Sequence, residues 1–266
     1  MGTTQYPKNR IPIQRVSSNG RRGTIISCPY CILGKSKLLY KLVTPLTLII
    51  STGLLIILFN FHPHATYANS PTALKSHPLP STLASWQDTT NSGNYFDQVA
   101  PVKVGYLIWS KFPVKVYIET PVSSNQAETW VKTVSNAVQE WNAYLPLEII
   151  NQPEVADITI TRKSPPLQGN PPRARSAQTT YSLYTENNFL YHRFAILLSP
   201  SQTGNYLLAA ARHELGHALG IWGHSKLQSD ALYFSQVRNP PLISVRDVNT
   251  LKRVYEQPTN LGWSIN

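Results

Sequence analysis

The chain has 266 residues, 42% of them hydrophobic and 14% charged, which is enough for one sizeable core with additional segments. Its formal net charge is +11, from 24 Lys and Arg against 13 Asp and Glu. Eight of the basic residues and none of the acidic ones lie in residues 1–41, so the remainder carries only about +3. The basic character therefore belongs to the N-terminus, and the composition does not indicate a nucleic-acid-binding domain.

A long apolar segment explains where the charge lies. Leu42–Phe61 contains no charged side chain, and about twenty apolar residues in a helix span a bilayer core of about 30 Å. Basic residues precede this segment and none follows at once, which predicts a cytoplasmic N-terminus and an exported remainder. Thr66-Tyr67-Ala68 resembles a signal-peptidase site, so cleavage near Ala68 is the alternative. We favour a retained single-pass anchor, because the apolar run exceeds the 7–15 residues of a signal-peptide core.

The two cysteines, Cys28 and Cys31, lie in the basic tail as C-P-Y-C. This spacing resembles the glutaredoxin motif, but that chemistry requires a βαβ scaffold for which the tail has no room. Half of a zinc knuckle is the other reading, and it lacks a second C-x-x-C pair. We interpret the segment as an unstructured tail with incidental thiols. The exported part then contains no disulfide.

The remaining residues divide into a linker and a folded domain. Residues 62–102, rich in Ser, Thr, Pro and Asn, are predicted to form a linker or short prosegment, and residues 103–266 the folded domain. Phe112–Glu119 alternates apolar and polar residues and is typical of a strand. A helix is predicted from Asn125, with Glu128 completing a capping-box pattern, to Pro146. Ala156–Ile160 follows as a second strand, which makes a right-handed crossover unit.

Two further strands precede the most informative part of the sequence. After a Pro- and Gly-rich loop at Ser164–Arg175, Thr179–Tyr184 and Leu190–Leu198 have strand character and are separated by Glu186-Asn187-Asn188. Together with the predicted helices they indicate the α/β class, with a twisted mixed sheet and long helices.

Ala211–Ser225 reads A-R-H-E-L-G-H-A-L-G-I-W-G-H-S. An apolar stripe at three- and four-residue spacing predicts a helix that ends at Gly220. His213 and His217 are four residues apart, so they lie on one helix face and both imidazoles can reach one cation. Zinc suits such a pair, since a catalytic zinc site has three protein ligands and an open fourth position. We expect His224, which the turn at the glycine can bring back, as the third ligand.

Glu214 follows the first histidine and is the candidate general base. Its carboxylate can take a proton from a zinc-bound water, whose pKa the metal lowers to about 7. This arrangement of residues predicts metal-assisted hydrolysis with the water as the nucleophile.

The motif H-E-x-x-H-x-x-G followed by a histidine resembles the zinc signature of the metzincin metallopeptidases, and the surrounding residues look most like the bacterial matrixin branch. The family pattern places the third histidine at the position of Gly223, one residue before His224, so Asp230 is the reserve ligand. Metzincins also have a methionine beneath the zinc. Here Leu232 is the Met-turn equivalent, a nearly volume-conserving replacement.

The resemblance implies a metzincin-like domain with a zinc helix and a small C-terminal subdomain. It implies a zinc endopeptidase that acts on extracytoplasmic proteins or peptides, with an extended substrate paired to the edge strand, for which Leu190–Leu198 is our candidate. Ile243–Tyr255 resembles the matrixin C-terminal helix, with Ser244 as N-cap and Asp247 three residues later. The exported part has no cysteine to cap the zinc, so Asp88 or Asp97 is the candidate for an inhibitory carboxylate.

Two other readings stay open. A non-catalytic, exported zinc-binding domain with a degenerate peptidase site would keep the three histidines without hydrolysis. A gluzincin-type site would take Glu256 as its third ligand. No residue pattern supports a calcium site or indicates an oligomeric state.

Overall fold

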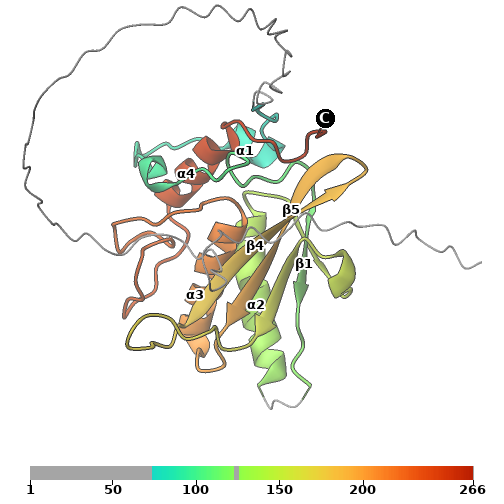
Figure 1. The fold of residues 1–266 in the computed structure, drawn as a ribbon. Coiled ribbons are helices and arrows are strands. Elements are labelled where there is room, and N and C mark those ends of the chain that lie inside the picture. The colour runs from blue at the N-terminus through green and yellow to red at the C-terminus, as the bar shows by residue number, and fades with distance from the viewer. Residues whose placement is uncertain (1–73, 123–125, 266) are drawn as a thin grey trace, which may run out of the picture. The chain divides into compact units, whose positions relative to one another are not determined.

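A five-stranded mixed sheet carries the fold (Figure 1). The structure, a computed structural model, describes residues 74–122 and 126–265. The basic tail with Cys28 and Cys31, the predicted membrane segment Leu42–Phe61 and the cleavage site at Ala68 lie outside the described residues. Within the described ranges no helix combines the length and apolar character needed to cross a membrane.

The sheet has the order β2-β1-β3-β5-β4. Its strands are β1 (Val114–Ile118), β2 (Leu147–Ile150), β3 (Ile158–Arg162), β4 (Ala177–Glu186) and β5 (Phe189–Leu198). All neighbours pair in parallel except β4 and β5, which form an antiparallel hairpin. The α/β class with a mixed sheet is therefore confirmed.

In the described ranges the sheet is accompanied by the α-helices α1 (Ser81–Ser85), α2 (Ala127–Asn142), α3 (Gly204–Ala218) and α4 (Val245–Tyr255). The two long helices α2 and α3 pack against each other and against the sheet (Figure 1). Trp141 of α2 is fully buried and donates its indole N–H to the carbonyl of Arg212 in α3. The Arg212 guanidinium pairs in turn with Glu140 of α2. The histidine-bearing helix is thus fixed against the core by apolar and charged contacts.

Two predictions about the sheet were wrong. The helix α2 leads into β2, a strand at the sheet edge that the sequence reading lacked, and only then into β3. Leu190–Leu198, predicted as the edge strand, lies within β5 in the interior of the sheet, and β4 is the edge strand. The pairing explains the difference. β5 pairs with β3 on one side, and the tight turn at Asn187 and Asn188, both with positive φ, places β4 on its other side.

The start of α4 is as predicted, whereas α2 ends at Asn142, before the predicted end at Pro146. Ser244 caps α4, and Asp247 closes a full capping box with it, as the sequence predicted. At α2 the predicted N-cap, Asn125, lies outside the described residues; Gln126 occupies the cap position and makes no side-chain cap bond.

The segment 74–102 belongs to the folded domain, which therefore begins by Leu74 and not near Lys103. Its backbone pairs with the C-terminal tail at Lys75 and Thr259. Further along, the Trp86 indole N–H donates to Asn249 of α4 over 2.9 Å. These contacts give this segment, predicted as a linker or prosegment, a structural role in the domain.

Replacing Leu83 by Ala tests this boundary. Leu83 of α1 is fully buried in the core cluster, so its truncation should lower the free energy of unfolding by about 2–5 kcal/mol. Leu74→Ala is the matched control, because Leu74 is 42% exposed. Denaturant unfolding followed by tryptophan fluorescence measures both. Equal midpoints for Leu83→Ala and the wild type would show that the segment does not contribute to the core.

Candidate metal centre

The C-terminal end of α3 is shaped by a glycine turn. The N–H of Gly220 donates to the carbonyl of His217, and the N–H of Ile221 donates to the carbonyl of Gly216, which is a Schellman motif. Gly220 has φ of 126° and leaves no room for a side chain, since a Cβ would lie 2.8 Å from the carbonyl oxygen of Leu107. The chain therefore turns sharply away from the helix at this point and runs on to His224.

The two helical histidines are oriented by backbone carbonyls. Nδ1 of His213 lies 2.9 Å from the carbonyl oxygen of Ala231, and Nδ1 of His217 lies 2.8 Å from that of Ile221. A carbonyl can only accept a hydrogen bond, so Nδ1 carries the proton in both rings and Nε2 holds the lone pair. The two Nε2 atoms face each other at 3.1 Å. Two lone pairs directed at one point form a site suited to a cation.

The structure brings His224 to the same place. Its ligand atoms and those of His213 and His217 all lie within 4.8 Å of one another, so this group of three could hold a metal ion. Gly223, where the family pattern has the histidine, is packed against the segment before β1: a Cβ there would overlap the carbonyl oxygen of Gln98. Gly223 also forms an antiparallel bridge with Val99. A side chain at position 223 has no space, and the next residue supplies the imidazole.

Burial favours the neutral form of the His217 and His224 imidazoles. Burial, with the charges of His213 and His224, lowers the pKa of His217 well below its usual value. Burial, followed by the charges of His213 and Arg175, lowers the pKa of His224 to about 3. Neutral imidazole is the form that binds a metal, so the environment favours the ligating state.

Glu214 is buried beside the histidines and bonds to the edge strand. The hydroxyl of Thr179 in β4 donates to a carboxylate oxygen of Glu214 over 2.6 Å. Burial raises the pKa of Glu214, while the charge of His213, the Thr179 hydrogen bond and the charge of Arg175 oppose the rise. A carboxyl group whose affinity for a proton is raised in this way is suited to proton transfer near neutral pH.

Leu232, the residue compared with the Met-turn methionine, is fully buried and packs against the helix that bears the histidines. Its side chain leaves no room for a Cβ at Gly216, one residue before His217. The turn that contains it is fixed from α4, because the Asp247 carboxylate accepts hydrogen bonds from the N–H groups of Ala231 and Leu232. The same turn presents the Ala231 carbonyl that orients His213. One carboxylate in α4 thus holds both the turn that contains Leu232 and a histidine acceptor.

The other acidic candidates do not join the histidine group in the described part of the chain. Asp230 is buried in an ion pair with Arg246 and accepts hydrogen bonds from two serine hydroxyls. Asp88 accepts hydrogen bonds from Thr90, Ser92 and Asn249, and Asp97 accepts one from a glutamine side chain. Glu256 forms the exposed C-cap of α4.

The sequence reading missed two residues of this site. Thr179 is one of several threonines in predicted strands, and only the sheet order shows that it reaches Glu214. Arg175 ends a polar loop, yet its charge acts on both Glu214 and His224. Neither position carries a local signal. Thr179 acquires its role from the packing of β4 on α3, and Arg175 from its place just before β4.

No protein-family model matches the chain, and no curated protein sequence matches it.

Replacing His224 by Ala tests the metal centre. Loss of one of three imidazole ligands should weaken metal binding by at least about 100-fold, which is about 2.7 kcal/mol. The measurement is competition with a chromophoric chelator under Zn²⁺ titration. His77→Ala is the control, since His77 lies outside the histidine group. An unchanged affinity in the His224 variant would remove this residue from the ligand set.

Proposed function

We propose that this protein is a zinc-dependent endopeptidase. The observation that carries the proposal is the convergence of three histidines, two with facing Nε2 lone pairs, next to a buried carboxylate that is hydrogen-bonded to the edge strand. We also propose, from the motif, that it is similar to the matrixin branch of the metzincins.

The donor set fits zinc. Each helical histidine donates its second ring N–H to a backbone carbonyl, which is the outer-shell contact that metal-bound histidines usually make. Three neutral imidazoles leave a fourth position open, as in catalytic zinc sites. When bound, zinc would supply a Lewis acid that polarises a carbonyl group and lowers the pKa of water.

Glu214 is the proton-transfer group in this proposal. Its carboxylate would accept a proton from the attacking water and deliver it to the leaving amine of the cleaved peptide bond. The Thr179 hydroxyl occupies one carboxylate oxygen at 2.6 Å and so fixes the direction of the carboxyl group. The raised pKa of Glu214, caused first by burial, favours the protonated form that the second transfer requires.

The sheet edge suits an extended peptide. In the described residues β4 pairs with β5 alone, so its second edge has backbone groups available for another strand. Thr179 in β4 bonds directly to Glu214, so a peptide paired along this edge would pass the carboxylate. We therefore propose that β4, and not the predicted Leu190–Leu198, is the strand that pairs with the substrate.

The location follows from the N-terminal sequence. We propose a single-pass anchor at Leu42–Phe61 with the catalytic domain on the exported side, where its substrates would be extracytoplasmic proteins.

The role of Glu214 is tested by Glu214→Gln. The substitution keeps the shape and removes the proton acceptor, so hydrolysis of casein should fall by at least about 1,000-fold while zinc content stays at one per chain. Glu256→Gln, an exposed change at the end of α4, is the matched control. Full activity in the Glu214 variant would contradict the assignment. Bound zinc without cleavage by the wild type would favour the non-catalytic alternative.

Thr179→Val tests the positioning of the carboxylate. Removal of the hydroxyl leaves Glu214 without its side-chain donor, so kcat should fall about 10–100-fold with little change in KM or zinc affinity. Thr180→Val is the control, because the Thr180 hydroxyl bonds to the carbonyl of Ala195 and not to Glu214. Thr179→Val should also alter the pH dependence of kcat. A substitution that only lowered stability would leave that pH dependence unchanged.

A further inference from the structure

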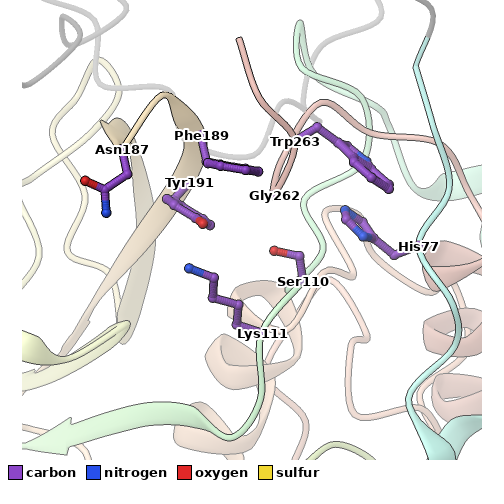
Figure 2. A pocket seen from close by; sticks show the side chains of 8 residues that line it. All are labelled: His77, Ser110, Lys111, Asn187, Phe189, Tyr191, Gly262 and Trp263. Carbon is purple, nitrogen blue, oxygen red and sulfur yellow. The ribbon is translucent and has the colours of Figure 1, made fainter.

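A second site lies at the opposite end of the β4–β5 hairpin from the histidines. A pocket of about 450 Å³ is lined by His77, Ser110, Lys111, Asn187, Phe189, Tyr191, Gly262 and Trp263 (Figure 2). Phe189 opens β5, and Ile196, which pairs with Thr179 beside Glu214, lies near the other end of that strand. At about 3.3 Å per residue these positions are roughly 20 Å apart. The volume falls within the roughly 300–1,000 Å³ of small-molecule sites.

The walls of the pocket are preformed by backbone hydrogen bonds. The N–H of Gly262 donates to the carbonyl of Leu190, and the N–H of Leu190 donates to the carbonyl of Trp263. The N–H of Ile265 donates to the carbonyl of Asn188. The C-terminal tail is therefore added to the start of β5 like a further strand, which fixes Trp263 relative to Phe189 and Tyr191.

Flat aromatic rings form two sides of the pocket. His77 and Trp263 stack with centroids 4.4 Å apart and an interplanar angle of 9°. Phe189 and Tyr191 stack at 6.4 Å and 21°. Figure 2 shows these pairs on opposite sides, with Ser110 between them. Phe189 is 38% exposed, so an apolar ring face remains in contact with water.

The charge of the pocket is positive. The Lys111 ammonium lies 4.2 Å from the centroid of the Tyr191 ring, and Lys75 lies 5.4 Å from that of Trp263. Among the described residues that line the pocket none is acidic. Glu186, opposite Phe189 in the hairpin, already interacts with another group. A cationic ligand would be repelled, whereas an anionic one would gain a charge-assisted contact with Lys111.

The backbone arrangement argues against a peptide as the ligand. Peptides commonly gain affinity by pairing with an exposed strand edge. Here the first residues of β5 are paired with β4 on one side and with the C-terminal tail on the other. A ring-shaped ligand with hydroxyl groups needs no such edge. Its faces can stack on the aromatic walls, and a hydroxyl can bond to Ser110, which lies between them.

We propose that this pocket binds an acidic saccharide, with a pyranose ring between the aromatic walls and its carboxylate at Lys111. The site is independent of the proposed peptidase chemistry and would hold the protein on an anionic polysaccharide. Its lining differs from the histidine group, so binding requires neither metal nor Glu214.

Calorimetry on the full-length chain tests the proposal. The Glu214→Gln protein is used in a polyoxyethylene detergent, since a maltoside headgroup could itself enter the pocket. The probes are the hexamers of galacturonate, mannuronate and hyaluronan, with cellohexaose as the neutral comparison. At least one acidic hexamer should bind at least about tenfold more tightly than cellohexaose, with an affinity that falls as salt is raised and does not respond to a chelator.

Variants place the binding in this pocket. Phe189→Ala and Lys111→Met should each weaken binding about tenfold or more, because one removes a stacking face and the other the ammonium group. Phe234→Ala and Lys132→Met, exposed residues of the same types outside the lining, should leave it unchanged. The proposal would be overturned if none of the three acidic hexamers bound, or if cellohexaose bound as tightly as they do. It would also be overturned if Phe189→Ala and Lys111→Met bound the acidic hexamer as tightly as the protein with the intact pocket. Tighter binding of an acetylated peptide that ends in phenylalanine than of the acidic hexamers would also overturn the proposal.

Discussion

The candidate site depends on two backbone carbonyls that accept hydrogen bonds from imidazole. Ile221 and Ala231 determine which nitrogen of His217 and His213 carries the proton, and so direct the lone pair of Nε2 in each ring. Each carbonyl is itself held in position by another part of the structure. The glycine turn after α3 positions Ile221, and the Asp247 carboxylate holds the turn that contains Ala231. The chemistry of the site is thus set by backbone placement as much as by the histidines.

Asp247 connects this support to the beginning of the described chain. Its buried carboxylate completes the capping box of α4, receives the N–H groups of the Leu232 turn and accepts a hydrogen bond from the Tyr95 hydroxyl. Burial and the nearby Asp247 raise the pKa of Tyr95 well above its usual value, so the phenol stays protonated and remains a donor. Asp247 therefore joins the segment around Tyr95, the helix α4 and the turn that contains Leu232.

Features that depend on neighbouring residues could be predicted from the sequence, whereas features that depend on tertiary packing could not. The spacing of His213 and His217, the glycine at the helix end and the Ser244 and Asp247 cap each depend on neighbours within a few residues, so they could be predicted. The sheet order could not, because β2 is short and the edge position of β4 depends on how the hairpin folds back. For the same reason Thr179 acquired its contact with Glu214 only in three dimensions. The role of residues 74–102 was missed because their Ser- and Pro-rich composition is also typical of linkers.

The bridge between Val99 and Gly223 has a consequence for the order of folding. It joins residues that are far apart in the sequence, next to the residue that supplies the third imidazole. Contacts of such long range close a large loop and tend to form late, after local helices and hairpins. The two helical histidines share α3, whereas His224 is held only once the segment around Val99 has packed against Gly223. The set of three imidazoles is thus complete only when parts of the chain more than a hundred residues apart are in contact.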